Sequence, residues 1–279
     1  MQISQVINSH KEYLKSFAKE TSRQSYEHLY RNFMSDFPGR EIQTITAEEA
    51  FTFLNKLTEG KQQATKRLRY QQLKAIINFA INSLDITMKQ ICSSQMLKTA
   101  FRAPKKIRKE LPDREVIDMI IYRTDNKRDK NFFECLVRSG CRVGEILKLK
   151  VKNVLGSKLV LESPKSGKAF ETAYLPDKVA QRLIDYIKEE NMQPEDRVFP
   201  LSYSGARSLM NRINEKFNTK IKLHDLRRFA ATHASRAGVP LEIISKAILR
   251  HSSTAITDTY LGKMSDSTAM QYVNGLYEK

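Results

Sequence analysis

The spacing of apolar residues in the first hundred positions predicts helices. Between residues 21 and 37 the large apolar side chains fall at intervals of three and four, which places them on one face of a helix. The members of this stripe are Tyr26, Leu29, Tyr30, Phe33 and Phe37. A stripe of this kind predicts a helix that packs against its neighbours along one side.

Two short patterns predict where helices begin. Thr21 and Gln24 have the spacing of a capping box, in which two side chains satisfy backbone N–H groups at the helix start. Thr46 and Glu49 repeat this spacing, and Gly60 marks the end of the helix that they open. The first hundred residues are therefore expected to form a helical domain.

Residues 61–84 form another predicted helix, which is basic at its start and apolar toward its end. Its basic end contains Lys61, Lys66 and Arg69. A run of charges is usually a solvated helix face, but the positive charge of the whole chain makes contact with a polyanion about equally favoured. From Lys98 to Lys109 there are six basic residues and no acid, a composition typical of a linker.

The second half of the chain contains two β-prone runs, residues 159–162 and 170–175, around a turn rich in Ser, Pro and Gly. They predict a β-hairpin with lysines at its tip. Before them, one helix is expected to end at Gly140 and another to begin near Arg142. A further helix is expected to start near Asp113, which can cap it.

The predicted fold is therefore mainly α with a small β-hairpin or sheet, in two domains. We expect a helical domain over residues 1–98, a basic linker over 99–110 and a mixed α/β domain over 111–279. A length of 279 residues suits two domains of this size.

The composition of the chain indicates which class of molecule it binds. The chain has 48 Lys and Arg against 31 Asp and Glu, a formal net charge of +17 that favours a polyanion, with double-stranded DNA first. An anionic membrane surface is the rival, but the longest apolar stretches are too short to span a bilayer. The three cysteines, Cys92, Cys135 and Cys141, show no CxxC spacing, so we expect neither a zinc site nor a disulfide framework. A reduced, cytoplasmic protein is expected.

Candidate reactive groups gather in the last fifth of the chain. His224, His233 and His251 occur there with Arg227 and Tyr260. The sequence shows no carboxylate–histidine cluster at metal-ligand spacing and no glycine loop for phosphates, so neither a metal nor a cofactor is predicted. Arginines can bind the nonbridging oxygens of a phosphodiester, and a tyrosine hydroxyl can attack its phosphorus.

Four motifs in this half resemble those of one family. "SGCRVGEILKL", "SPKSGKAFETAYLP", "HDLRRFAATHASRAG" and "LRHSSTAITDTYLG" occur in the order and approximate spacing of the tyrosine recombinases, the phage-integrase family that includes Xer-type enzymes. Each motif alone is weak, but four in order are highly specific. The helical first domain resembles the family's core-binding domain, and the second its catalytic domain.

The resemblance assigns roles residue by residue. It implies six catalytic residues and one supporting acid: Arg142, Lys165, His224, Arg227, His251 and Tyr260, with Glu145 in support. Tyr260 would be the nucleophile, and Lys165 would protonate the departing 5′ oxygen. The spacing of His224 and Arg227 would set both on one face of a helix.

The implied reaction is site-specific DNA recombination through a 3′-phosphotyrosyl intermediate, without metal or cofactor. The implied partners are double-stranded DNA, gripped in a C-shaped clamp, three further copies of the chain in a tetrameric synapse, and accessory proteins that bend DNA or set direction. A nucleoid-associated location follows from these partners. The residues expected to contact DNA are Lys61, Lys66, Arg69, Lys105, Lys106, Arg108, Lys109, Arg228 and Arg250.

The chain departs from the family at one position. Arg250 stands where many relatives have glycine, directly before the second histidine, and places a bulky cation in a tight turn. Lys168 is an alternative to Lys165 as the general acid, since both flank the turn of the hairpin. For each residue alone an ordinary structural or surface role is also open, and His233 is expected to have a structural one.

Three other functions are compatible with parts of the pattern. A type IB topoisomerase would use similar chemistry without pairing two sites, but the helical first domain and the "RVGEILKL" segment favour a recombinase. A DNA-binding regulator without catalysis would not need the complete reactive set. An RNA-binding or membrane-surface protein would need only the charge.

Overall fold

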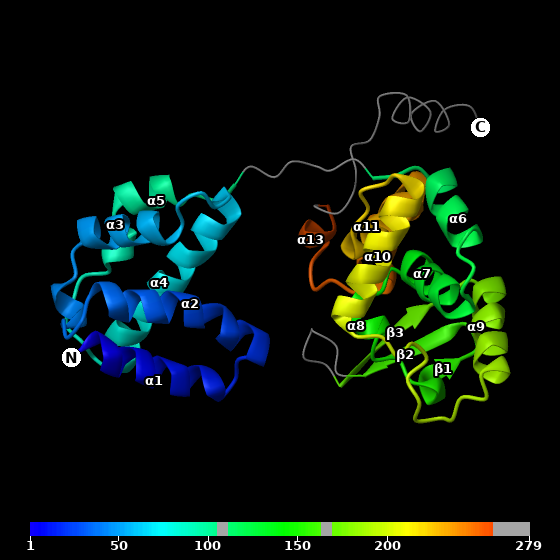
Figure 1. Ribbon diagram of the computed structural model, residues 1–279, viewed down its shortest axis with the longest axis horizontal. Helices are drawn as coiled ribbons and strands as arrows, with labels where there is room; N and C mark the ends of the chain where they lie inside the picture. The colour runs from blue at the N-terminus through cyan, green and yellow to red at the C-terminus, as the bar shows by residue number, and fades with distance from the viewer. Residues whose placement is uncertain (105–110, 163–168, 259–279) are drawn as a thin grey trace. The chain divides into compact units, whose positions relative to one another are not determined.

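The computed structural model describes residues 1–104, 111–162 and 169–258. The chain divides into two compact units, Met1–Ile107 and Arg108–Lys279 (Figure 1). Thr99 and Ala100 belong to the last helix of the first unit, and Phe101 is buried in its core. These residues are therefore part of the first unit and not of a linker that begins at 99.

The described part of the first unit is helical, and its helices enclose one apolar core. The core includes Leu29, Tyr30 and Phe33 of the predicted stripe, against which Tyr26 and Phe37 pack. The elements are α1 (Ile3–Lys15), α2 (Glu20–Asp36), η1 (Ile42–Thr44), α3 (Ala47–Leu57), α4 (Gln63–Ser83), η2 (Ile91–Ser93) and α5 (Gln95–Ala100).

One of the two predicted capping boxes is present. The Thr46 N–H donates to Oε2 of Glu49 over 2.9 Å, and the Glu49 N–H donates to Oγ1 of Thr46 over 3.1 Å, so α3 begins as predicted. The box at Thr21 and Gln24 was wrong, because α2 already starts at Glu20. Gln24 instead donates to the Glu20 carboxylate one turn earlier.

The second unit surrounds a small antiparallel sheet with helices. Its described elements are α6 (Arg114–Tyr122), α7 (Lys127–Ser139), α8 (Val143–Ile146), η3 (Val151–Asn153), β1 (Val154–Leu155), β2 (Lys158–Glu162), β3 (Phe170–Tyr174), α9 (Asp177–Glu189), α10 (Tyr203–Phe217), α11 (Leu223–Arg236), α12 (Leu241–Ile243), the π-helix η4 (Ile244–Ile248) and α13 (Thr254–Asp258).

The sheet has the order β1-β2-β3 among the described residues, and both pairs of strands are antiparallel. The β2–β3 hairpin was predicted, and the two-residue strand β1 was missed because so short a run has no recognisable period. Burial alternates along β3, with Glu171 and Ala173 inward and Phe170 and Tyr174 outward. An acidic residue at an inward position is unusual and requires a partner.

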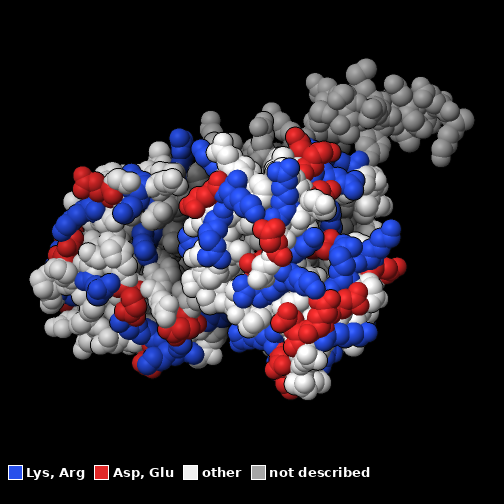
Figure 2. Space-filling view, turned by 45° about the vertical axis from the view of Figure 1, so that its right-hand side comes forward, with Lys and Arg blue, Asp and Glu red and all other residues white. Residues whose placement is uncertain are grey.

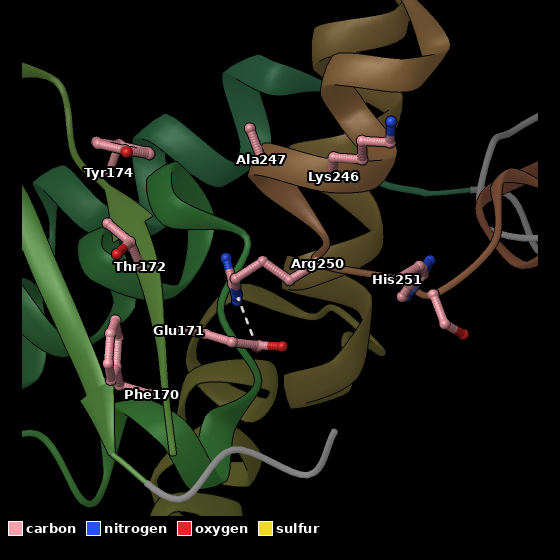
Figure 3. Close-up of a pocket in the computed structure, with 9 residues that line it drawn as sticks. Phe170, Glu171, Thr172, Tyr174, Lys246, Ala247, Arg250 and His251 are labelled. Carbon is pink, nitrogen blue, oxygen red and sulfur yellow. Dashed lines mark ion pairs between the residues drawn. The ribbon is translucent and has the colours of Figure 1, made fainter. Parts of the chain in front are cut away.

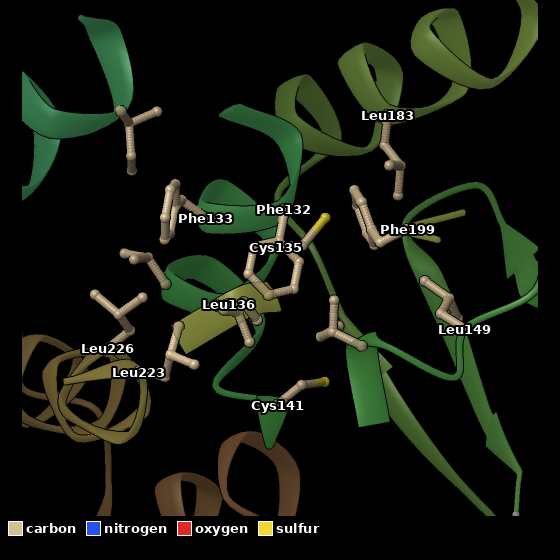
Figure 4. Packing of buried hydrophobic residues seen from close by; sticks show 14 of the residues in the cluster. Phe132, Phe133, Cys135, Leu136, Cys141, Leu149, Leu183, Phe199, Leu223 and Leu226 are labelled. Atoms are coloured by element: carbon tan, nitrogen blue, oxygen red, sulfur yellow. The ribbon is translucent and has the colours of Figure 1, made fainter. Parts of the chain in front are cut away.

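Helix α7 is the centre of the second unit. Nine of its thirteen residues are buried, and Phe132, Phe133 and Leu136 belong to the core that also holds Leu183 of α9 and Leu226 of α11 (Figure 4). The helix ends at Gly140, which has φ +62°, and α8 begins directly after its N-cap Arg142, as predicted. Asp113 lies at the N-cap of α6, but its side chain makes no capping hydrogen bond.

The described residues thus form a mainly helical protein with a small three-stranded sheet, as the sequence predicted. Within this part of the chain, no helix combines the length and the apolar character needed to cross a membrane.

Candidate active site

Arg142 is held in place by Glu145, three residues later. The backbone N–H of Arg142 donates to Oε2 of Glu145 over 2.8 Å, and its Nη1 donates to Oε1 over 2.7 Å. Burial opposes ionisation of Glu145, but the charge of Arg250 and the hydrogen bonds from Arg142 outweigh it and lower the pKa of this carboxyl. Glu145 is therefore a carboxylate that orients the first predicted catalytic arginine.

Arg227 is buried among groups from distant parts of the chain. Only 1% of the residue is exposed. Its guanidinium donates to the carbonyl oxygens of Gly140 and Leu249, and Nη2 lies 3.2 Å from Nε2 of His251. A buried cation needs acceptors of this kind, and they fix the direction of the guanidinium plane.

The backbone around Arg227 is tightly packed. A Cβ atom on Gly140 would lie 2.7 Å from Cγ2 of Ile248, so this position takes glycine both for its positive φ and for space. Ile248 is the last residue of η4, and π-helical turns are frequent at functional sites. Here the turn is followed by Leu249, whose carbonyl oxygen accepts from Arg227.

His251 rests as a neutral imidazole. Because an arginine can only donate, the contact with Arg227 makes Nε2 the acceptor, and Nδ1 then carries the proton toward Oγ1 of Thr257 at 3.0 Å. Burial, followed by the charges of Arg227 and Arg142, lowers the pKa of His251 to about 4.

His224 lies in the first turn of α11, one turn before Arg227. It is exposed, unlike Arg227, although desolvation of its ring and the charge of Arg227 still lower its pKa. Both predicted catalytic histidines are therefore neutral near pH 7.

Arg250 has a different environment from the one predicted. Its side chain is 4% exposed, and its Nη2 lies 3.0 Å from Oε2 of Glu145. Its Nε lies 3.6 Å from Oε2 of Glu171 on β3, an ion pair visible in Figure 3. The expectation that Arg250 contacts a DNA phosphate is therefore not supported, because its charge is already used inside the protein.

An open pocket of about 730 Å³ lies beside this cluster. One wall is formed by Phe170, Thr172 and Tyr174 of β3, and the other by Lys246 and the segment from Arg250 to Ser252 (Figure 3). His251 lines the pocket, so a ligand in it can reach the neutral imidazole.

A comparison with protein families identifies the second unit. Residues 113–266 match the model of the phage integrase family, which is more than half of the chain. The chain belongs to the phage integrase family. It is accordingly a site-specific tyrosine recombinase.

Individual relatives agree with this family. Tyrosine recombinase XerA of Pyrococcus horikoshii is 28% identical over 246 residues, which cover 83% of this chain and 81% of that protein. The Tn1549 transposon integrase in complex with transposon right end DNA has the same fold, with a TM-score of 0.78 at 15% identity over 99% of both chains. A lambda integrase tetramer bound to a Holliday junction has a TM-score of 0.75 at 16% identity, over 95% of this chain and 80% of that one.

The structure of the recombinase brings Arg142, Glu145, Arg227 and His251 together. Among the described residues it shows no group of three or more His, Cys, Asp or Glu side chains arranged to hold a metal ion. Six predicted site residues lie outside the described part of the chain: Lys165, Tyr260, Lys105, Lys106, Arg108 and Lys109.

The remaining predicted DNA contacts differ in exposure. Lys61 is exposed, and Lys66 and Arg228 are half-buried. Arg69 turns toward α2, where its Nη1 donates to the carbonyl oxygen of Ser25 over 2.6 Å, so its role as a DNA contact is not supported. Lysine and arginine side chains are spread over the visible surfaces of both units, with acidic side chains among them (Figure 2).

Sequence reasoning missed two residues of the cluster. Glu171 pairs with Arg250, and its position on the inward side of β3 is a signal that the alternation of the strand could have given. Thr257 contacts Nδ1 of His251, and no sequence pattern distinguishes it from other threonines.

Proposed function

We propose that this recombinase exchanges DNA strands through a 3′-phosphotyrosyl intermediate on Tyr260, without a metal ion. The observation that carries the proposal is the meeting of Arg142, Arg227 and His251 from three segments at one place. Arg227 contacts His251 directly, and the charge of Arg142 is close enough to lower the pKa of the same imidazole. Two guanidinium groups near a neutral imidazole suit a phosphodiester and a proton acceptor.

In the cleavage step, Oη of Tyr260 attacks the scissile phosphorus and forms a new P–O bond, while the bond from phosphorus to the 5′ oxygen breaks. The phenol proton passes to a histidine, and both His224 and His251 have lowered pKa values, so each ring is neutral near pH 7 before the proton arrives. Lys165 supplies the proton for the departing 5′ oxygen. Rejoining reverses these transfers with the 5′ hydroxyl of a partner strand.

The arginines stabilise the charge that develops on the nonbridging oxygens. Making the phenoxide of a tyrosine with a pKa of about 10 costs roughly 4 kcal/mol at neutral pH, and two nearby cations offset part of this cost. Glu145 fixes Arg142 by two hydrogen bonds, so little reorganisation of that side chain is required when the phosphate binds.

We further propose double-stranded DNA as the substrate and a homotetramer as the working assembly. The net charge of +17 supports a polyanionic substrate. The lambda integrase tetramer on a Holliday junction, which shares the fold, supports the assembly. Accessory proteins that bend the DNA or set direction remain part of this proposal.

The experiment is to recover and sequence DNA that is covalently attached to the protein in cells. A nicked duplex with the recovered sequence should then form a 3′ adduct on Tyr260, and Tyr260→Phe should bind the duplex normally without forming it. An adduct on another tyrosine, or efficient cleavage by Tyr260→Phe, would contradict the assignment. A plasmid with two recovered sites should undergo deletion, whereas relaxation without deletion would indicate a topoisomerase.

A further inference from the structure

Arg250 occupies a backbone conformation that side chains rarely adopt. Its φ is +51°, in the left-handed region that glycine enters without cost. The sequence resemblance expects glycine here, and the structure shows why a glycine would suit the turn. An arginine at such a position needs a compensating interaction of its side chain.

The side chain of Arg250 joins three segments of the second unit. Its Nη2 donates to Oε2 of Glu145 in α8 over 3.0 Å, and its Nη1 donates to the carbonyl oxygen of Ile248 in η4 over 2.8 Å. Its Nε faces Oε2 of Glu171 on β3 at 3.6 Å. The side chain therefore lies between the segment that holds Arg142 and the strand that leaves the hairpin.

The charges of this cluster depend on Arg250. The side chains of Glu145 and Glu171 are 8% and 6% exposed. Two carboxylates at this depth need a cation, because burial penalises each charge that is not paired. Arg142 pairs with Glu145, whereas the only ion pair of Glu171 within the described residues is with Arg250.

We propose that Arg250 is a positioning residue for strand cleavage. It fixes Glu145, whose two hydrogen bonds orient Arg142, and it holds β3 against the same cluster through Glu171. Arg250 thereby links β3, the strand that follows Lys165 in the sequence, to the segment of Arg142, the arginine proposed to bind the phosphate. This inference rests on the proposed function and gives Arg250 a role in the reaction in place of a DNA contact.

The test compares four variants on the nicked duplex recovered with the wild-type protein. Arg250→Gly removes both ion pairs and suits the backbone, and Arg250→Lys keeps one positive charge. Arg250→Gly alone leaves the buried carboxylate of Glu171 without its ion pair, which can destabilise the fold. The double variant Arg250→Gly, Glu171→Gln removes that carboxylate charge as well, so it is the variant to use if Arg250→Gly does not fold. Lys188→Ala is the control, because Lys188 is an exposed lysine of the same unit, in the last turn of α9, and is not among the residues that line this pocket.

Three quantities are measured for each variant: the cleavage rate constant at saturating DNA, the affinity as a function of salt, and the thermal unfolding midpoint. We expect Arg250→Gly and the double variant to cleave roughly 10-fold to 100-fold more slowly, because small displacements of a reacting group are costly. Their affinity should stay close to that of the wild type, with an unchanged salt slope, and Arg250→Lys should recover part of the rate. Lys188→Ala should cleave like the wild type.

Two results would overturn this inference and leave the proposed function intact. A weaker affinity with a salt slope lower by about 0.9, and normal cleavage at saturation, would make Arg250 a phosphate contact. Normal cleavage by the folded double variant, with only a lower unfolding midpoint, would make the cluster structural. Absence of any adduct with the wild type would overturn the proposed function, and this inference with it.

Discussion

Gly140 and Ile248 are in such close contact that a Cβ atom on Gly140 would lie 2.7 Å from Cγ2 and 3.1 Å from the carbonyl oxygen of Ile248. Gly140 ends the helix before Arg142, and Ile248 ends the π-helix before His251. Arg227 donates to the carbonyl oxygen of Gly140 and contacts His251. This contact therefore sets the separation between the segments that carry Arg142 and His251, two of the predicted catalytic residues, and Arg227 contacts both segments.

Gly140→Ala is expected to destabilise the second unit. The left-handed conformation costs an alanine about 1–2 kcal/mol, and the clash with Ile248 adds roughly 1–3 kcal/mol of overpacking. Urea unfolding of the wild type and the variant measures the change. Gly144→Ala is the matched control, because its φ is not positive and a Cβ there meets nothing within 4 Å. Equal stabilities for Gly140→Ala and Gly144→Ala would show that Ile248 can move away from a Cβ atom at position 140 without cost.

His251 should make stability depend on pH. Its pKa is lowered from the ordinary 6.5 to about 4 in the folded state, so the unfolded chain binds a proton at this site first as the pH falls. The contribution of the neutral imidazole is then fully present above pH 6.5 and is lost as the pH falls toward 4.

The measurement is the difference in unfolding free energy between the wild type and His251→Gln at several pH values. Glutamine does not titrate, and His10, whose pKa is also lowered to about 4 by burial, is common to both proteins. The stability advantage of the wild type should shrink between pH 6.5 and 4. A difference that stays constant over this range would mean that the pKa of His251 is not lowered.

Four basic residues near the boundary of the two units in the sequence are predicted to bind DNA phosphates. Lys105, Lys106, Arg108 and Lys109 are replaced together by glutamine, and affinity for the recovered duplex is measured at several salt concentrations. Each lost phosphate contact should reduce the slope of log affinity against log salt by about 0.9. Replacement of Lys150 and Lys152, which pair with Glu195, is the control. An unchanged slope and affinity would make the segment a solvated spacer.

Lys165 is predicted to be the general acid. Lys165→Ala should slow cleavage by roughly 10² to 10⁴, as is typical when an acid–base group is removed. A duplex with sulfur in place of the bridging 5′ oxygen has a leaving group that needs no proton, so it should restore cleavage by Lys165→Ala. Arg227→Ala should not be rescued, because the nonbridging oxygens still need its charge. Rescue of Lys168→Ala instead would move the role to Lys168, and rescue of neither would leave the hairpin only a binding role.

Local sequence was sufficient for most of the fold. The stripe from Tyr26 to Phe37, the capping box of Thr46 and Glu49, and the turn at Gly140 each depend on residues a few positions apart, so periodicity and capping chemistry reveal them. The same holds for His224 and Arg227, which one helix places a single turn apart. The start of α2 was misplaced because the side chain of Gln24 had two possible partners nearby, the backbone of Thr21 and the carboxylate of Glu20. In the structure it donates to Glu20.

The tertiary structure decided the charge state and surroundings of the site. Arg227 meets Gly140 from 87 positions away, and Arg250 meets Glu145 from 105 positions away. From the sequence, Arg250 was a bulky cation in a tight turn, and a phosphate contact was the role predicted for it. Burial, pairing and pKa depend on which groups arrive from distant segments and exclude water, and only the folded chain brings Glu145, Glu171 and Arg250 into one place.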